Sequence, residues 1–125
     1  MEICKRSLLD FEEAEYQRGF DMMSEERKAA VLRYRSEKDR KRSVLGEIMV
    51  RQAISRSCHI AEEDILFGRT EAGKPYAMNA DIHFSISHSK DMVVSLEVYV
   101  LQLMMCLYME YQMKNIFLKK EILSL

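Results

Sequence analysis

The sequence has little proline, glycine, cysteine or net charge, and it has no tryptophan. Of its 125 residues, one is proline, four are glycine and three are cysteine, and 19 basic residues are balanced by 20 acidic ones. So little proline and glycine excludes collagen-like and low-complexity chains. A formal net charge of −1 gives no overall electrostatic reason to bind nucleic acid, and we predict no such partner. With 48% hydrophobic and 31% charged residues, the composition predicts one folded domain.

The three cysteines indicate a reducing compartment. Cys4, Cys58 and Cys106 are odd in number and match no metal-ligand spacing, so we expect free thiols and a cytoplasmic protein. The N-terminus has no apolar core of signal-peptide length. No segment approaches the roughly 18 to 20 consecutive apolar residues that a membrane-spanning helix needs, so we predict no membrane segment.

The clearest predicted element is one long helix. Ser36-x-x-Asp39 is a capping-box pattern, and the helix it begins runs to about Ser57. Ser24 predicts a second cap, for a helix near residues 24–34. Apolar residues recur at steps of three and four along one stripe of the long helix, and charged residues occupy the other positions. We therefore expect Arg40, Lys41, Glu47 and Arg51 to face outward.

Alternating and β-rich stretches predict a small sheet. The expected strands are residues 1–8, 65–68, 83–87 and 92–100, and residues 9–23 have an approximately helical spacing of apolar residues. Together with the long helix, these elements predict an α+β fold in which a small antiparallel sheet packs against one long helix.

From about residue 95 the sequence changes character. Residues 101–125 are rich in apolar side chains and have neither turn residues nor a clean helical stripe. A helix in this tail would expose an apolar side, which favours self-association or misfolding.

Three short segments carry groups that suit a phosphate. Gly73-Lys74-Pro75 places a cation in a turn, Ser87-His88 offers a hydroxyl and an imidazole at the end of a strand, and Arg42-Ser43 offers a guanidinium beside a hydroxyl. Between Ser24 and Cys58, ten basic residues outnumber five acidic ones, which suits a small polyanion such as a nucleotide. Taken singly, each segment also fits an ordinary solvated surface.

Taken together, the segments resemble a known family. F-S-I-S-H-S, E-A-G-K-P-Y and R-S-V-L-G-E are similar to the first half of the larger, pseudo-dimeric 4′-phosphopantetheinyl transferases, over roughly Ser24 to Val94. The resemblance implies that residues 1–100 are the N-terminal half of a pseudo-twofold fold and that 101–125 lie outside the family pattern. It also implies coenzyme A as substrate, and an acyl or peptidyl carrier protein whose serine receives the phosphopantetheine.

The resemblance assigns roles to seven residues. By analogy with the family, Arg42 and Ser43 would hold the 3′-phosphate of coenzyme A together with a basic residue at position 27. The turn residues would lie along the adenine and phosphates, and the Ser-His pair would contact the phosphates. The residues carried over are Arg27, Arg42, Ser43, Lys74, Pro75, Ser87 and His88. Ala30 stands where the family often has a second basic residue.

The motifs of the family's second half do not occur in this sequence. A Gly-Ile-Asp-Ile-Glu strand and a Trp-x-x-Lys-Glu helix supply its magnesium ligands and catalytic lysine, so we assign no catalytic or metal residue here. A shifted reading frame is one hypothesis for the tail. Met104-Met105 must be encoded ATG-ATG, and reading one base earlier yields Asp-Val at about the distance of the magnesium strand. The same shift does not restore the Glu two positions after that Asp.

Three interpretations remain open at this stage. The chain is a truncated transferase, a coenzyme A-binding half-domain that assembles with itself or with a separate second half, or an unrelated α+β adaptor with coincidental motifs. Aggregation or proteolysis of the tail would favour the first, and a stable oligomer would favour the second.

Overall fold

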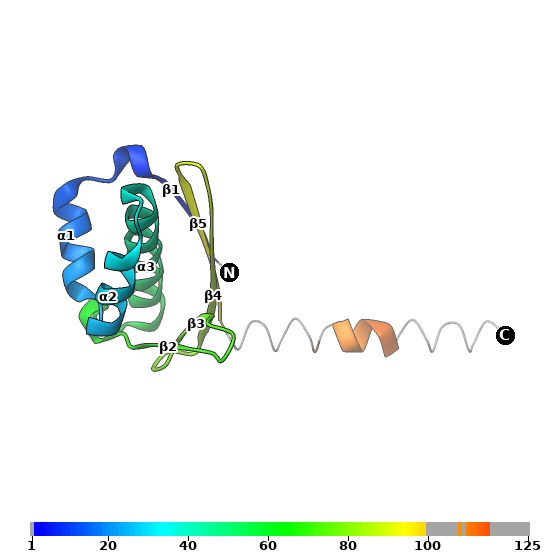
Figure 1. Ribbon diagram of the computed structural model, residues 1–125. Coiled ribbons are helices and arrows are strands. Elements are labelled where there is room, and N and C mark those ends of the chain that lie inside the picture. The colour runs from blue at the N-terminus through cyan, green and yellow to red at the C-terminus, as the bar shows by residue number, and fades with distance from the viewer. Residues whose placement is uncertain (1, 100–107, 109, 116–125) are drawn as a thin grey trace.

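A three-stranded antiparallel sheet lies against a layer of helices in the computed structural model, which describes residues 2–99, 108 and 110–115. Figure 1 shows the helices gathered on one face of the sheet, with α3 next to the strands and α1 farther out. The sheet order is β1-β5-β4. The strands are β1 (Glu2–Ser7), β4 (Ile82–Ser89) and β5 (Met92–Tyr99), and the helices are α1 (Glu13–Met22), α2 (Glu25–Arg33) and α3 (Glu37–Cys58). The predicted α+β class is confirmed.

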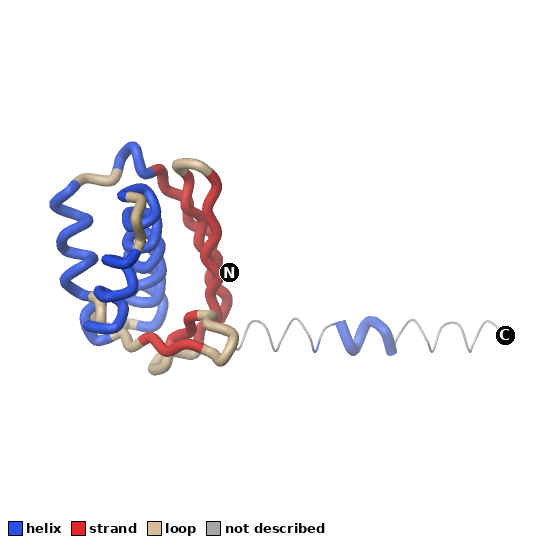
Figure 2. The backbone as a smooth tube through the Cα atoms, in the orientation of Figure 1, coloured by secondary structure: helices blue, strands red, loops and turns tan. Residues whose placement is uncertain are grey.

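Smaller elements complete the described part of the chain. A two-stranded antiparallel sheet of β2 (Phe67–Arg69) and β3 (Pro75–Ala77) lies beside the N-terminal part of β4, as the red segments of Figure 2 show. Short 3₁₀ turns cover Leu8–Asp10 and Glu62–Asp64. The strand β3 was not predicted, and β2 lies about two residues later than expected. No helix among the described residues has the length and apolar character that crossing a membrane requires.

Both predicted helix caps are present. Ser24 Oγ accepts a hydrogen bond from the Arg27 amide at 3.2 Å, and Ser36 Oγ accepts one from the Asp39 amide at 3.4 Å. These bonds satisfy amides that the first helical turn leaves unpaired. At the other end of α3, His59 adopts the left-handed conformation that closes many helices (φ 56°).

The core surrounds α3 on two sides. One cluster joins α3 to α1 and β5 through residues such as Val44, Leu45 and Val93, and a second joins its C-terminal half to β4 through Ile54 and Phe84. Gly46 lies on the side of α3 that packs against the sheet. A Cβ at this position would meet Ile86 Cγ2 at 3.0 Å, so the absent side chain permits the close approach.

The predicted outward direction of two charged residues on α3 is wrong. Arg40 and Lys41 are half-buried, but Glu47 and Arg51 are buried, with only 9% and 5% of their surfaces exposed. A carboxylate and a guanidinium can be buried together because each neutralises the other and the remaining donors find carbonyl oxygens. The predictions for the tail concern residues 101–125. The structure describes residues 108 and 110–115 of this segment, and these are helical; the other tail residues lie outside the described residues.

Candidate functional site

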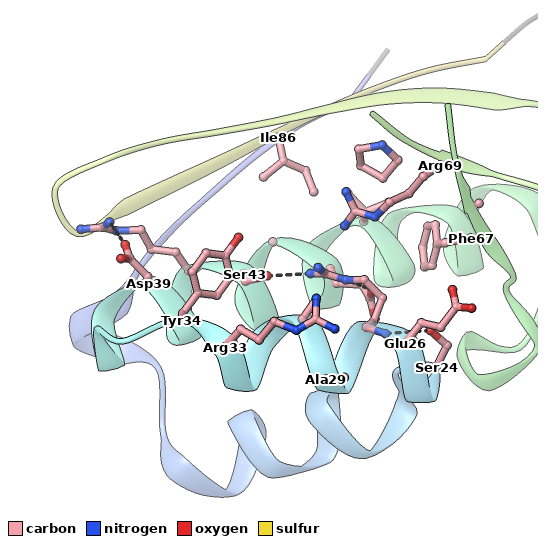
Figure 3. Close-up of a pocket in the computed structure, with 18 of the residues that line it drawn as sticks. Ser24, Glu26, Ala29, Arg33, Tyr34, Asp39, Ser43, Phe67, Arg69 and Ile86 are labelled. Carbon is pink, nitrogen blue, oxygen red and sulfur yellow. Dashed lines mark hydrogen bonds and ion pairs between the residues drawn. The ribbon is translucent and has the colours of Figure 1, made fainter. Parts of the chain in front are cut away.

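A pocket of about 1070 Å³ opens between the two helices α2 and α3 on one side and the strands β2, β3 and β4 on the other. Figure 3 shows side chains entering it from both sides, including Arg33 from α2, Ser43 from α3 and Arg69 from β2. Of the seven residues predicted from the sequence, five line this pocket. They are Arg27, Arg42, Ser43, Pro75 and His88.

Arg27 crosses from α2 to the side of α3. Its Nη2 donates to Ser43 Oγ at 2.6 Å, and its Nε lies 3.5 Å from Glu47 Oε1. Ser43 and Glu47 are four residues apart, so they lie one above the other on the same face of α3. The guanidinium is therefore held against one turn of the helix, at the wall of the pocket.

Arg42 joins the start of α3 to the turn between β4 and β5. Its Nε donates to the carbonyl oxygen of Lys90 at 3.0 Å, and its Nη1 lies 2.8 Å from Asp39 Oδ1. Lys90 has a positive φ of 55°, which the tight turn requires. A second contact, 2.7 Å between Lys38 Nζ and Asp91 Oδ1, holds the same turn. That contact keeps the pKa of the Asp91 carboxyl below its ordinary value.

Alternation along β4 decides which of its polar residues reach the pocket. Phe84, Ile86 and His88 share the face that lines it, whereas the hydroxyl of Ser87 is on the other face of the strand and exposed. Lys74 is exposed in the turn before β3 and, among the described residues, is not part of the lining. The roles predicted for Ser87 and Lys74 remain predictions.

The lining also includes two arginines and two aromatic residues that were not predicted from the sequence. Arg33 and Arg69 have no ion pair among the described residues, and Tyr34 and Phe67 add aromatic surface. Arg69 also donates to the Gly73 carbonyl at 2.8 Å and so braces the turn that precedes β3. No motif marks these positions, and only the fold brings them together. Ala30 also lines the pocket, at the position where the family often has a second basic residue.

The acidic residues of the pocket do not fit a magnesium site. Glu47 is shared between Arg27 and Arg51, Asp39 is paired with Arg42, and Glu25 is paired with Lys28. Among the described lining residues, Glu26 alone is a carboxylate without an ion pair. A magnesium ion needs several oxygen ligands held at octahedral positions, and one exposed carboxylate does not provide them. Within the described ranges, the one group of three potential metal ligands is Glu2, Cys4 and Glu97, which is not part of the pocket lining.

Comparison with known proteins decides the ancestry. A family model described as "4'-phosphopantetheinyl transferase, N-terminal" matches residues 11–97. The chain belongs to the 4′-phosphopantetheinyl transferase family. The interpretation as an unrelated adaptor is therefore excluded.

Curated relatives of this phosphopantetheinyl transferase family member are longer proteins. The chain is 44% identical over 72 residues to the 4′-phosphopantetheinyl transferase gsp of Aneurinibacillus migulanus. This match covers 58% of the present chain and 30% of gsp. The chain is 36% identical over 81 residues to the transferase Sfp of Bacillus subtilis, covering 64% of this chain and 36% of that protein. The chain thus spans about a third of the length of these relatives.

Solved structures share the fold of this family member at low sequence identity. A holo-(acyl-carrier-protein) synthase from Bacillus anthracis, in complex with CoA (3',5'-ADP), superposes with a TM-score of 0.61 and 20% identity, covering 78% of this chain and 91% of that one. The Helicobacter pylori synthase, in complex with coenzyme A, gives a TM-score of 0.56 and 16% identity, covering 78% and 96%. The fold is therefore that of the phosphopantetheinyl transferases.

Proposed function

We propose that the pocket binds coenzyme A and that Arg27 and Ser43 contact its 3′-phosphate. The observation that carries this proposal is the 2.6 Å contact between these two side chains at the pocket wall, where a guanidinium and a hydroxyl offer donors to one anion. His88 lines the same pocket from β4 and adds an imidazole. Two further arginines, Arg33 and Arg69, supply cations for the other phosphates.

The reaction we assign to the complete enzyme is phosphopantetheinyl transfer to a carrier protein in the cytoplasm. The serine hydroxyl of an acyl or peptidyl carrier protein attacks the β-phosphate of coenzyme A, forms a phosphodiester with the phosphopantetheine, and releases 3′,5′-ADP. The residues of this pocket would hold the 3′,5′-ADP part of coenzyme A, which is the leaving group. Magnesium, which this reaction uses in the family, would find one unpaired carboxylate, Glu26, among the described pocket residues. One carboxylate is not a ligand set for this ion, so we assign this chain nucleotide binding without turnover on its own.

Assembly with a second unit is the alternative function. The described fold corresponds to nearly the whole of the two solved synthases, since 91% and 96% of those chains are covered. This observation favours a unit that builds its site with a copy of itself or with a separately encoded second half. Mass measurement in solution tests it: a stable dimer or trimer supports assembly, and a monomer opposes self-assembly.

A shifted reading frame is our proposal for the residues that follow the family match, which ends at residue 97. Sequencing the gene through the codons for Val93 to Tyr108 tests the hypothesis. An uninterrupted frame with no second-half motif in either alternative frame would contradict it.

Calorimetric titration with coenzyme A and with dephospho-coenzyme A tests the proposed binding, with and without magnesium. We expect coenzyme A to bind more tightly than the analogue that lacks the 3′-phosphate, and we expect magnesium to have little effect. Equal affinity for the two compounds would contradict the roles of Arg27 and Ser43. Conversion of an apo carrier protein to its holo form by the purified chain would contradict the absence of turnover.

A further inference from the structure

Glu47 is a buried carboxylate shared by two arginines. Its Oε1 lies 3.5 Å from Arg27 Nε, and its Oε2 lies 3.3 Å from both Nε and Nη2 of Arg51. One oxygen thus pairs with the residue at the pocket wall, and the other with a residue of the core. Only 9% of the Glu47 surface is exposed, so water screens these contacts little.

Arg51 is held in place independently of Glu47. Its Nη1 donates to the carbonyl oxygens of Glu62 at 2.7 Å and Ile65 at 3.1 Å, and its Nη2 donates to that of Met22 at 3.3 Å. The guanidinium carbon also lies 4.9 Å from the centre of the Phe67 ring, a cation–π contact. Arg51 therefore provides a fixed point against which the Glu47 carboxylate is oriented.

Arg27 depends on fewer contacts. Its Nε and Nη2 lie on one edge of the planar guanidinium, and this edge is occupied by Glu47 and Ser43. Its Nη1 has no hydrogen-bond partner within the part of the chain that the structure describes. A guanidinium held by this edge can still offer Nη1 and the second hydrogen of Nη2 to a phosphate, with little loss of side-chain entropy on binding.

We infer that Glu47 is a positioning residue: anchored by Arg51, it holds the guanidinium of Arg27 in the orientation that receives the 3′-phosphate. This inference rests on the proposed binding of coenzyme A. It assigns Glu47 no contact with the ligand, and it accounts for a buried negative charge beside a pocket for an anion.

The direction in which coenzyme A affinity changes when Glu47 is replaced distinguishes a positioning role from simple charge repulsion. A negative charge near the pocket repels a phosphate, so its removal alone would tighten binding. If Glu47 orients Arg27, its removal weakens binding instead. Glu26 provides a matched control because it also lines the pocket, on the same helix as Arg27, but it is exposed and has no ion pair among the described residues.

The test compares Glu47→Gln with Glu26→Gln by titration with coenzyme A and with dephospho-coenzyme A. We expect Glu47→Gln to weaken coenzyme A binding about tenfold and to leave dephospho-coenzyme A binding unchanged, because one charge-assisted contact loses its geometry. Glu26→Gln should leave coenzyme A binding equal or slightly tighter. Unchanged or tighter binding of coenzyme A by Glu47→Gln would overturn the inference.

Two further variants keep the result interpretable. In an Arg27→Ala background, Glu47→Gln should cause no further loss of coenzyme A binding, whereas a merely structural loss would add to that of Arg27→Ala. Should Glu47→Gln fail to fold, Glu47→Asp keeps the charge, shortens the reach to Arg27 and should show the same selective loss of coenzyme A binding.

If the unaltered protein fails to distinguish coenzyme A from dephospho-coenzyme A, the proposed function fails. If it does distinguish them and Glu47→Gln behaves like the parent, only the positioning role fails.

Discussion

The Arg27 guanidinium donates a hydrogen bond of 2.6 Å to the hydroxyl of Ser43, across the contact between α2 and α3. The two residues are 16 positions apart, and the capped starts of both helices bring them together. The same guanidinium lies beside the Glu47 carboxylate. The groups that we propose bind the phosphate are thus part of the helix packing.

Replacement of Arg27 by alanine should weaken coenzyme A binding by about ten- to a hundredfold. The change removes a charge-assisted contact with the phosphate, for which losses of about 1.5 to 3 kcal/mol are typical. Calorimetric titration of the variant with coenzyme A measures this loss of affinity. Lys28→Ala is the matched control, because Lys28 is adjacent on α2 but is not part of the pocket lining. Equal effects of the two substitutions would show that only overall charge matters.

Replacement of Arg51 by alanine should strongly destabilise the fold. The change leaves Glu47 with one cationic partner instead of two and strips three carbonyl oxygens of their donor. Breaking a buried ion pair from one side costs about 3 to 5 kcal/mol. Urea denaturation followed by circular dichroism measures the loss.

The exposed ion pair between Arg56 and Glu2 serves as the comparison for Arg51. Its nitrogen and oxygen lie 2.6 Å apart, but the arginine side chain is 55% exposed. Such pairs contribute about 0 to 1 kcal/mol. We expect Arg56→Ala to lower the free energy of unfolding by no more than that, and a loss as large as that of Arg51→Ala would contradict the argument from burial.

Glu97 should make the fold less stable as pH rises. Burial on β5 raises the pKa of its carboxyl above the ordinary value and outweighs the neighbouring Ser95 hydroxyl, which lowers it; the negative charge of Glu2 adds to the rise, and the positive charge of Arg56 opposes it. Cys4 completes the group of potential ligands that faces it from β1. Because the folded state favours the protonated acid, its stabilising contribution is complete below the ordinary carboxyl pKa and is lost as pH rises through the raised value.

Urea denaturation at a series of pH values checks the contribution of Glu97. The free energy of unfolding should fall between acidic and neutral pH in the parent protein, and Glu97→Gln should flatten this dependence because an amide does not ionise. Parallel pH profiles for the two proteins would mean that Glu97 ionises as freely in the folded state as in the unfolded one.

Local signals predicted the helices well, and long-range pairing explains most of what was missed. Ser24 and Ser36 predict the starts of their helices because an N-cap hydrogen bond involves only residues within one helical turn. The strand β3 has three residues, and its existence depends on pairing with β2 rather than on its own sequence. The burial of Glu47 could not be predicted from helical spacing, since a period indicates which residues share a face and not whether a second charge neutralises one of them.

The candidate site was predicted in part for the same reason. Five of the seven chosen residues line one pocket, because the motifs that carry them lie at element ends that the fold brings together. Ser87 and His88 are neighbours in the sequence, yet strand alternation sends their side chains to opposite faces of β4. Arg33 and Arg69 were not predicted because neither belongs to a sequence motif. They become candidates only when the fold places α2 and β2 on opposite sides of the pocket.

The crystal structure of the chain with coenzyme A tests the central claim most directly. We predict that the 3′-phosphate lies in the pocket between α2 and α3, within hydrogen-bond distance of the Arg27 guanidinium and the Ser43 hydroxyl, with the contact between Arg27 and Glu47 preserved. A nucleotide bound elsewhere, or one in the pocket whose 3′-phosphate contacts neither of these two side chains, would contradict it.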